Sequence, residues 1–439
     1  MKTLAIISEY NPFHNGHLYQ FSKAKEITKS DYILVVMSGN FVQRGEPAII
    51  NKWARADMAL TAGADLVIEM PFVFSTQDAN GFALGGVTLL NALNVVQYLC
   101  FGCENNNRNT LSAIGRFLSS ENANFKNLLR KNSKKGFEYP KARAQAICEY
   151  HEKFGIDKIK MTSSLQLMEI LSSPNNILAI EYIKHLLKIK SAILPIPIKR
   201  IGSAYHEETI QRSISSATSI RNEIFQNIKY PYQINKKSAG KIKSVMPFSA
   251  YHILYKELSE GRAPVSLNRY EQYILATLRN MPKEKLYLIH GINEGLENRI
   301  KNAALKSTDI DMLLSSIKTR RYTLTKIKRI LLHVMMDLSK EDVTLFNNYG
   351  PMYIRVIGFS HKGKTLLKTI KQKSSLPIIT KLSNFLREVN SEKPLHYKNL
   401  LKMIKYDILS TDLYNLGYSE VNARVARTDF TSRLINKND

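Results

Sequence analysis

Cysteine is scarce in this chain, because 439 residues contain only 3. So few cysteines argue against a disulfide scaffold and favour a reducing compartment, so we expect a cytoplasmic protein. Cys100 and Cys103 form a C-x-x-C pair, but the sequence holds no second pair to complete a zinc site. We interpret them as small residues near the end of a strand and predict no metal site.

Long hydrophobic runs are also rare. The first apolar run, Leu4–Ile7, is too short for a signal peptide. The stretch Ala79–Cys103 carries no charge and is long enough to cross a bilayer, but Asn and Gln residues and several glycines interrupt it. We therefore predict a helix followed by a buried strand at Val95–Phe101, and no contact with a membrane.

Acidic residues are few relative to basic ones. The chain has 63 Lys and Arg against 37 Asp and Glu, which gives a net charge of +26. A surplus of this size favours a polyanionic partner, most often a nucleic acid. The alternative is that the excess lysines only solvate the surface.

Apolar segments alternate with helical patterns in the first half of the chain. This alternation predicts an α/β fold with a doubly wound parallel sheet covered on both faces. The predicted strands are Thr3–Ile7, Tyr32–Met37, Leu66–Glu69 and Val95–Phe101, with Ala192–Ile198 as an edge strand because of its prolines. The predicted helices are Gly16–Ile27, Lys52–Ala62, Gly81–Leu93, Asn109–Lys131, Lys141–Phe154 and Asn176–Lys190, with a basic turn at Arg130–Gly136.

The second half has a mainly helical pattern. We place a linker near Tyr230–Gln233 and predict two domains, residues 1–228 and residues 229–439. The clearest helical segments are Ala250–Leu258, Leu267–Arg279, Arg321–Leu338 and Lys398–Leu413, with another at Glu294–Leu305 and one short strand at Met352–Ile357.

An H-x-G-H sequence, His14 to His17, follows the first predicted strand and opens the first predicted helix. The start of a helix offers free N–H groups and partial positive charge to a phosphate. Imidazoles beside it can stabilise charge that grows on the phosphate during displacement at the α-phosphorus. We therefore predict an ATP site of an adenylate-forming enzyme, with His14 and His17 as its catalytic residues. Two surface histidines at a helix start are the alternative.

A Ser/Thr-rich segment, Ser215–Arg221, opens a helix at the far end of the same predicted domain. Its hydroxyl and N–H groups, including those of Ser219, can hold the β- and γ-phosphates, and Arg221 can act as a cationic clamp. An ordinary helix cap with a solvated arginine is the alternative.

These two motifs together resemble the nucleotidylyltransferase superfamily, with its HUP/Rossmann-like fold. More specifically, the chain resembles the bacterial tRNA(Met) cytidine acetate ligase family. The resemblance covers most of the chain and is strongest in the Ser-Gly-x-Phe-x-Gln-Arg-Gly-Glu-Pro loop. The matching segments are Glu9–His17, Met37–Ala48, Asn51–Arg55, Phe101-Gly102, Ser173–Leu178 and Ser216–Arg221, with a weaker match at Arg355–Phe359.

The resemblance implies a two-step ligase. Acetate and ATP, with Mg²⁺ and no tightly bound cofactor, form acetyl-adenylate, and the acetyl group then moves to the wobble cytidine of elongator tRNA(Met). It also implies ATP contacts from the loop after the first strand and from three later positions. These residues are Ile7, Ser8, Glu9, Tyr10, Asn11, Pro12, Phe13, His14, Asn15, Gly16, His17, Leu18, Tyr19 and Gln20, then Gly102, Asn175 and Arg200. The alternatives are that Gly102 is a turn glycine, that Asn175 caps a helix and that Arg200 is a solvated arginine.

The RNA contacts are less sharply defined by the sequence. Basic clusters give candidate phosphate contacts without sequence specificity. The candidates are Arg44, Arg321, Lys328, Arg329, Lys362 and Lys364. Arg44 lies on the Ser38–Pro47 loop, which we expect either to close the site against water or to meet RNA. Two other functions stay open: adenylylation of a small phosphorylated cofactor precursor, and RNA binding without catalysis. The oligomeric state does not follow from the sequence.

Overall fold

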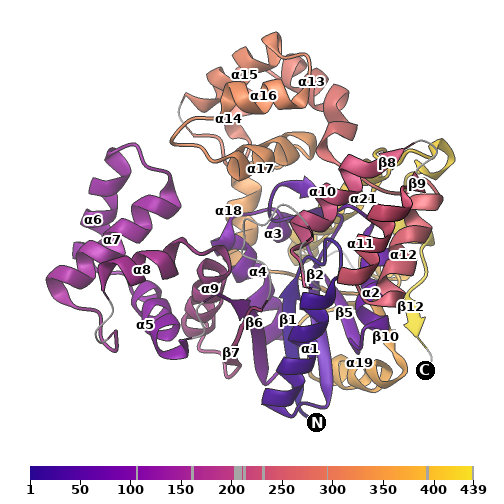
Figure 1. Ribbon diagram of the computed structural model, residues 1–439, viewed down its shortest axis with the longest axis horizontal. Helices are drawn as coiled ribbons and strands as arrows, with labels where there is room; N and C mark the ends of the chain where they lie inside the picture. The colour runs from indigo at the N-terminus through magenta and orange to yellow at the C-terminus, as the bar shows by residue number, and fades with distance from the viewer. Residues whose placement is uncertain are drawn as a thin grey trace.

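A computed structural model describes residues 1–104, 107–159, 163–201, 210, 214–229, 233–293, 295–391 and 395–437. Its centre is a mostly parallel sheet with the strand order β11-β10-β5-β2-β1-β6-β7, which β12 joins by pairing with β10 (Figure 1). The strands are β1 (Thr3–Ser8), β2 (Tyr32–Ser38), β5 (Leu66–Met70), β6 (Tyr98–Cys103), β7 (Leu194–Lys199), β10 (Ile354–Ser360), β11 (Ile378–Ile379) and β12 (Ile435–Lys437).

The strands that the first half contributes to the central sheet, β1, β2, β5, β6 and β7, pair in parallel, as predicted. The chain runs from β1 outward through β2 to β5, and then returns to the other side of β1 with β6 and β7. The strand order therefore reverses between β1 and β6. In open α/β sheets, ligands bind in the crevice beyond the carboxyl ends of the strands at this reversal.

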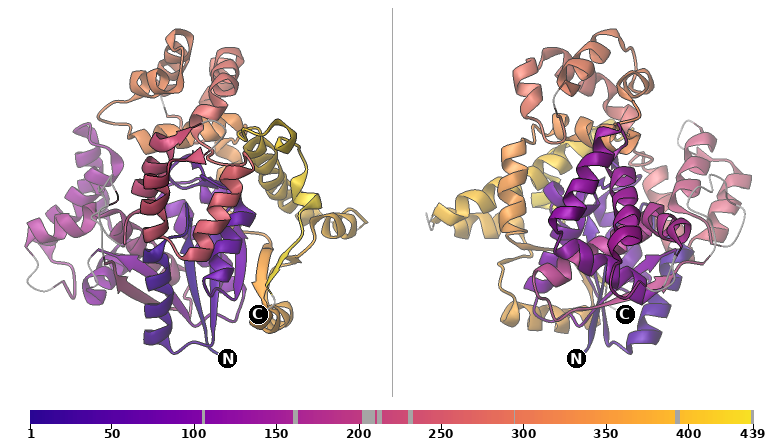
Figure 2. Two further views of the ribbon diagram at one scale, coloured as in Figure 1. Left: turned by 45° about the vertical axis from the view of Figure 1, so that its right-hand side comes forward. Right: turned by 90° about the vertical axis from the view of Figure 1, so that its left-hand side faces the viewer.

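Alternate residues of β1 enter two different cores. Leu4 and Ile6 pack on the face covered by α1, α2 and α12, whereas Ala5 and Ile7 pack on the face covered by α4 and α9. The left view of Figure 2 shows α10 and α11 lying with α12 on the side of α1. The bounds of these helices are α1 (Asn15–Thr28), α2 (Lys52–Thr61), α4 (Ala79–Ala92), α9 (Pro174–Lys188), α10 (Ala217–Asn227), α11 (Lys236–Val245) and α12 (Phe248–Ser259).

The uncharged stretch Ala79–Cys103 folds as helix α4 followed by strand β6, as predicted. None of the helices in the described part of the chain is long and apolar enough to cross a membrane. Cys100 and Cys103 are buried in β6, in the strand where the sequence had placed them.

One predicted helix was wrong, because Asn109–Lys131 is two helices. The break falls at Ser120, where α5 ends, and Asn122 caps α6 by accepting the N–H of Phe125 at 3.0 Å. The predicted basic turn at Arg130–Gly136 is helical as far as Lys134. Four helices form the lobe beside α9: α5 (Arg108–Ser119), α6 (Ala123–Lys134), α7 (Tyr139–Phe154) and α8 (Ser164–Ser172).

The second half is mainly helical, but it also contributes to the central sheet. The predicted strand Met352–Ile357 forms as β10, which pairs antiparallel with β5. The sheet thus crosses the predicted boundary at 228/229, and the two-domain division stays a prediction. Of the predicted linker, residues 230–232 lie outside the described residues, and Gln233 begins β9 (Gln233–Ile234), which pairs with β8 (Ile228–Lys229).

The remaining helices lie mostly above and beside the sheet in Figure 1. The predicted segment Leu267–Arg279 begins as a short 3₁₀ helix, Leu267–Tyr270, before α13. The others are α3 (Phe72–Ser75), α13 (Glu271–Asn280), α14 (Lys283–Leu288), α15 (Leu296–Lys306), α16 (Ile310–Ile317), α17 (Leu324–Met335), α18 (Lys340–Tyr349), α19 (His361–Lys373), α20 (Leu382–Ser391), α21 (Leu395–Asn415) and α22 (Thr428–Thr431).

Candidate active site

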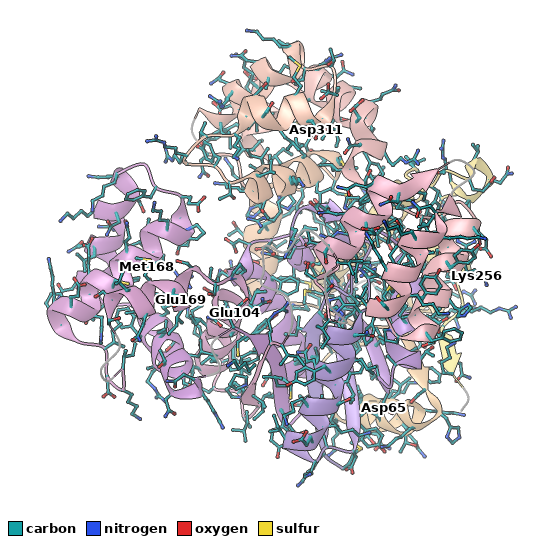
Figure 3. The ribbon with its side chains drawn as sticks, viewed as in Figure 1. Asp65, Glu104, Met168, Glu169, Lys256 and Asp311 are labelled. Carbon is teal, nitrogen blue, oxygen red and sulfur yellow. The ribbon has the colours of Figure 1, made fainter. Side chains whose placement is uncertain are left out.

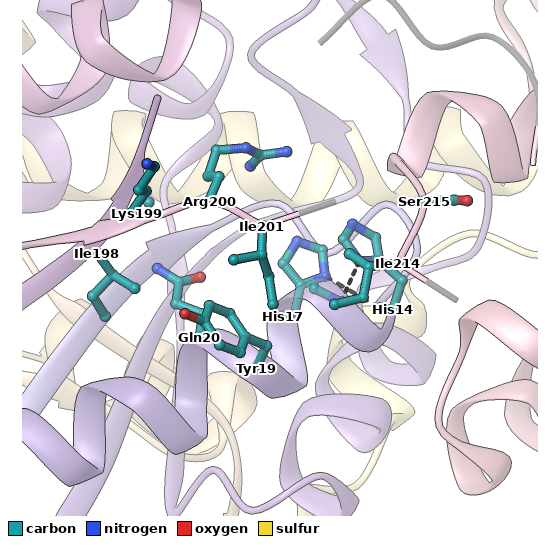
Figure 4. A pocket seen from close by; sticks show the side chains of 12 residues that line it. His14, His17, Tyr19, Gln20, Ile198, Lys199, Arg200, Ile201, Ile214 and Ser215 are labelled. Atoms are coloured by element: carbon teal, nitrogen blue, oxygen red, sulfur yellow. Dashed lines mark hydrogen bonds between the residues drawn. The ribbon is translucent and has the colours of Figure 1, made fainter. Parts of the chain in front are cut away.

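A cleft of ≈ 420 Å³ lies beyond the carboxyl ends of β1 and β6, where the strand order reverses. Both halves of the chain line it. The lining residues from the first half include Ile7, Ser8, Glu9, Tyr10, Asn11, His14, His17, Gln20, Gln43, Arg44, Asp78, Gly102, Asn175, Tyr182, Arg200, Thr218 and Arg221, and those from the second half are Thr323, Thr325 and Arg329. A smaller pocket of ≈ 40 Å³ shares both histidines with this cleft (Figure 4).

Helix α1 begins in this cleft with the H-x-G-H sequence. His14 is the capping residue, and its Nδ1 accepts the backbone N–H of Gly16 at 3.0 Å. Nδ1 of His17 accepts the backbone N–H of His14 at 3.2 Å. The two imidazoles thus form a capping box, in which side chains satisfy the free N–H groups of the helix start. A side chain at Gly16 would place its Cβ 2.8 Å from the His14 ring, so glycine leaves the room that this ring needs.

The protonation of the two histidines follows from their surroundings. Burial, together with the nearby cations Arg200 and Arg221, lowers the pKa of His14 to about 3. Burial, His14 and Arg200 lower the pKa of His17 well below its usual value. Both rings are therefore neutral at pH 7. Because each Nδ1 accepts a backbone N–H, each ring carries its single proton on Nε2 and offers an N–H donor there.

Aromatic packing holds the two rings in place. They stack on each other with centroids 3.8 Å apart and planes inclined by 28°. Tyr10 and Phe13 pack against His17 with centroid distances of 4.8 and 5.3 Å. Tyr10 reaches this position from β1 through a left-handed backbone conformation, with φ of 47°. The two N–H donors are therefore preorganised.

Helix α10 also begins at the wall of the cleft. Ser216 caps it by accepting the N–H of Ser219 at 3.1 Å. The Ser219 side chain is fully buried, and its hydroxyl donates back to the Ser216 carbonyl at 2.8 Å. The cleft wall at this helix start contains Thr218 and Arg221, and Ser219 does not line it. Arg221 donates to the carbonyl of Asn11 at 2.8 Å, which ties the two motifs together.

The three later ATP positions meet at the end of β6. A Cβ at Gly102 would lie 3.3 Å from Cγ of Arg200, so glycine lets the arginine side chain cross the strand end. Nδ2 of Asn175 donates to Glu104 at 2.5 Å, and the N–H of Asn176 donates to the same carboxylate at 3.1 Å. Glu104 thus fixes the start of α9. Glu104 was not assigned a role from the sequence, because it lies three residues beyond the predicted strand Val95–Phe101 and directly follows only the observed β6.

The other residues of the 7–20 stretch differ in position. Pro12 and Phe13 are buried, and Phe13 belongs to the core. Gly16 and Tyr19 line the smaller pocket, whereas the Leu18 side chain is exposed. Nδ2 of Asn15 donates to the carbonyl of Ser244 at 3.1 Å, which joins the start of α1 to the last turn of α11.

The Ser38–Pro47 loop forms a hairpin of β3 (Phe41–Val42) and β4 (Glu46–Pro47) over the cleft. Its Gln43 N–H donates to the carboxylate of Glu9 at 2.9 Å. Its Arg44 lines the cleft and donates to the Thr218 hydroxyl at 3.1 Å. Burial raises the pKa of Glu9, against the opposing effect of Arg44 and Arg221.

The same hairpin packs against the second half of the chain. Gly45 has a φ of +77°, and a Cβ there would lie 2.4 Å from the backbone nitrogen of Arg329. Lys328 forms an ion pair with Glu46 at 2.5 Å, and Arg329 donates to the carbonyl of Gln43 at 3.2 Å. The N-terminal end of α17 therefore closes one side of the cleft.

Arg55 is a positioning residue that the sequence analysis did not assign. Its guanidinium is fully buried and donates to the carbonyls of Glu9 at 2.6 Å and Ser38 at 3.0 Å, and also to that of Gly39. The Glu9 carbonyl directly follows β1, and the carbonyls of Ser38 and Gly39 lie at the end of β2. Arg55 thus joins the two chain segments that lead into the H-x-G-H turn and the hairpin.

Buried ion pairs connect the sheet to the C-terminal region. Lys52 lies 2.8 Å from both Glu69 and Asp429, and Arg355 lies 2.7 Å from Asp429 and 3.3 Å from Glu69. Burial, followed by the charge of Glu69, raises the pKa of the adjacent Asp407 to about 7. Lys52 and Arg355 come from two of the segments that carried the resemblance, and this network gives both a structural role.

The RNA candidates fall into two groups. Arg44 and Arg329 line the cleft, Lys328 lies beside it, and Arg321 is exposed just before α17. The second group, Lys362 and Lys364, begins α19 at the opposite end of the sheet. There, Lys362 donates to the carbonyl of Asp31, which precedes β2. The structure therefore does not bring the two groups together.

No group of three or more His, Cys, Asp or Glu side chains that could hold a metal ion occurs in the described part of the chain. Only two carboxylates, those of Glu9 and Asp78, appear among the described residues that line the cleft. Asp78 accepts the N–H of Gly81 at 3.1 Å as the cap of α4. A divalent ion here would rely mainly on the phosphates of a nucleotide and on water for its ligands.

Residues 1–429 match the family model described as HIGH Nucleotidyl Transferase. The chain is 42% identical over 437 residues to the tRNA(Met) cytidine acetate ligase of Acetivibrio thermocellus, covering 99% of this chain and 100% of that protein. It is 41% identical over 436 residues to the protein of the same name from Halothermothrix orenii, with 99% of each chain covered.

Two solved structures are similar to this chain over their whole length. The crystal structure of Thermotoga maritima TmcAL bound with alpha-thio ATP matches with a TM-score of 0.90 and 36% identity, covering 100% of both chains. The apo form of the same protein matches with a TM-score of 0.93, at the same identity and coverage.

Proposed function

The chain belongs to the HIGH nucleotidyl transferase family and, within it, to the tRNA(Met) cytidine acetate ligases, and from this premise we propose the following mechanism. The protein is an ATP-dependent enzyme that forms acetyl-adenylate and transfers the acetyl group to the exocyclic amine of the wobble cytidine of elongator tRNA(Met). The product is N4-acetylcytidine, and the proposed site of action is the cytoplasm.

The observation that carries this proposal is the pair of neutral imidazoles at the start of α1. In the first step, an acetate oxygen attacks the α-phosphorus of ATP, and pyrophosphate leaves. His14 and His17 present Nε2–H donors to the phosphate oxygens on which charge accumulates, and the helix start adds its partial positive charge. Acetate is already an anion, so neither histidine has to remove a proton.

The cations of the cleft complete the nucleotide site. Arg221 is held between Asn11 and Thr218, at 2.8 and 3.3 Å, in a position to neutralise the leaving pyrophosphate. Arg200 crosses the end of β6 next to Gly102 and supports the nucleotide there. Mg²⁺ supplied with ATP would rely mainly on the phosphates for its ligands and would offset their charge.

In the second step, the N4 amine of cytidine attacks the acyl carbon. The N–C bond forms, the C–O bond to AMP breaks, and AMP leaves with the electron pair. The amine loses one proton, and the carboxylates that line the cleft, Glu9 and Asp78, are the groups that can accept it. Asp78 is engaged as a helix cap, so Glu9 is the better placed of the two.

The hairpin explains how a reactive anhydride survives in this site. Acetyl-adenylate hydrolyses if water reaches it, so the cleft has to exclude water between the two steps. Contacts with Glu9 on one side and with α17 on the other hold the hairpin over the cleft. Arg44, at the tip of the hairpin, donates a hydrogen bond to Thr218 on the side of the cleft where we place the nucleotide.

An acetyl-transfer assay, read together with ATP–pyrophosphate exchange, tests the proposal. The protein is incubated with labelled acetate, ATP, Mg²⁺ and tRNA(Met), and nucleosides from the digested RNA are separated. Label in N4-acetylcytidine is the expected result. Acetate-dependent ATP–pyrophosphate exchange without labelled cytidine would refute the transfer step. Absence of exchange would favour a binding protein, and turnover without RNA on a small phosphorylated precursor would favour the other enzyme.

A further inference from the structure

Helix α12 carries an outer face of aromatic side chains that no step of the proposed reaction uses. Phe248 is 64% exposed and Tyr255 is 48% exposed, although both are large apolar groups. His252 lies between them and is also exposed, and Tyr251 is half-buried on the same side. The spacing of 3, 4 and 7 residues puts all four on one face, opposite Ala250 and Leu254, which are buried in the core.

These rings form an ordered surface. Phe248 and His252 lie edge to face with centroids 4.2 Å apart and planes inclined by 73°. Tyr251 and Tyr255 lie nearly parallel, inclined by 28°, with centroids 6.2 Å apart. Rings held at fixed spacing with open faces are a suitable platform for flat, polarisable groups such as nucleobases.

Lysines surround the rings. Helix α11 packs against α12 and carries four lysines and no acidic residue. Lys236, Lys237 and Lys243 are exposed, and Nζ of Lys243 lies 5.4 Å from the centre of the Phe248 ring. Lys256 extends from α12 at the outer surface, where Figure 3 labels it. We call Lys236, Lys237, Lys243, Phe248, His252, Tyr255 and Lys256 the aromatic–lysine face.

The acidic residues near this face are already paired. Glu257 points inward and is bound by Arg262 and Asn51, and Glu223 pairs with Lys241. The face therefore presents a surplus of positive charge around exposed rings, which matches a polyanion with unpaired bases. An apolar protein surface would leave the charges of these lysines without partners.

The face begins next to the active-site turn. The hydrogen bond of 3.1 Å from Asn15 to the Ser244 carbonyl places the end of α11 against the start of α1. Phe248 follows four residues later as the first residue of α12. An RNA loop on the aromatic–lysine face would thus lie beside the wall that carries His14 and His17.

We propose that the aromatic–lysine face binds the RNA substrate, with Phe248 and Tyr255 stacking on unpaired bases of the loop that carries the target cytidine. The lysines contact the phosphates around those bases. This inference rests on the proposed function for the identity of the RNA. It adds a contact surface separate from the cations at the hairpin and α17.

The test compares full-length variants in binding to tRNA(Met) and to its isolated anticodon stem-loop. Phe248→Ser combined with Tyr255→Ser should weaken binding of both RNAs by about 10-fold or more, because each aromatic ring lost removes a stacking contact with one base. Acetate-dependent ATP–pyrophosphate exchange and the thermal midpoint should stay as in the wild type, because both side chains are exposed.

A matched control is Tyr349→Ser on α18, since Tyr349 is also 64% exposed. It should bind both RNAs as the wild type does. A separate variant, Lys236→Ser with Lys237→Ser, should reduce the slope of log affinity against log salt by about one for each lost phosphate contact. Loss of affinity in the aromatic variant with an unchanged salt slope would fit stacking.

Equal RNA affinity of the aromatic variant and the Tyr349→Ser control would overturn the proposal. So would a change from dimer to monomer with unchanged RNA affinity, because the face would then join two copies of the chain. A wild type that binds tRNA(Met) through this face but transfers no acetyl group would contradict the proposed function alone. The two failures are therefore distinguishable.

Discussion

The two ends of the central sheet use their polar side chains differently. At the carboxyl ends of β1 and β6, His14, His17 and Arg221 surround a cleft. At the opposite end, Asp65 accepts the N–H of Ile33 at 2.8 Å and the hydroxyl of Ser360 at 3.2 Å, and so only joins strands. Figure 3 labels Asp65 there.

This difference follows from the parallel strands. At their carboxyl ends the chain leaves each strand through a loop and enters a helix by its N-terminus, so free N–H groups converge on one crevice. At the other end, helices enter strands and offer carbonyls. The opposite end therefore suits cations such as Lys362, which donates to the Asp31 carbonyl. The helices that follow the parallel strands therefore favour an anionic ligand at the carboxyl ends of those strands.

The strongest test of the comparison removes a donor from the cleft end. His17→Ala deletes one Nε2–H and should lower acetate-dependent ATP–pyrophosphate exchange by between about 100-fold and 1000-fold. The matched control, Lys364→Ala at the opposite end, should leave exchange unchanged. Full exchange in His17→Ala would remove this histidine from the mechanism.

A second test separates the two chemical steps within the cleft. Glu9→Gln keeps an oxygen for the Gln43 N–H but cannot accept a proton. We expect acetyl transfer from preformed acetyl-adenylate to fall by about 100-fold, with exchange nearly preserved. The transfer rate should also lose its rise with pH. An equal fall in both steps would instead indicate a role in nucleotide binding.

A third test measures stability against pH. The pKa of His14 is about 3 in the folded chain and about 6.5 when unfolded, so below pH 6.5 the unfolded state binds one more proton. The free energy of unfolding should therefore fall with acidification. His14→Asn keeps a capping side chain and should reduce that slope by about 1.4 kcal/mol per pH unit between pH 6.5 and 4. Denaturant titrations at several pH values measure it.

The smallest expected effect concerns the opposite end itself. Lys362→Ala with Lys364→Ala should change the affinity for tRNA(Met) by less than about twofold, because these solvated cations lie away from the cleft. Arg321→Ala combined with Lys328→Ala should weaken the affinity for tRNA(Met) more than the Lys362/Lys364 pair does. Filter binding at one fixed salt concentration compares the two pairs, and a larger loss at α19 would reverse this ranking.

Much of the site was predictable because its signals are local. The H-x-G-H turn, the serine-rich start of α10 and the alternation of strands and helices each lie within a short segment. Arg55 and Glu104 were not predictable in the same way. Their roles depend on carbonyls and N–H groups that come from other segments, such as the Glu9 carbonyl for Arg55 and the Asn176 N–H for Glu104.

The sequence by itself determined the parallel α/β core, the nucleotide motifs and the excess of positive charge. Apolar periodicity and helix-start chemistry are properties of neighbouring residues. Only the tertiary structure decided that β10 joins the sheet through β5, that Ser219 is buried while Thr218 lines the cleft, and that the basic clusters lie at two ends. These outcomes depend on packing between distant segments, which no local pattern encodes.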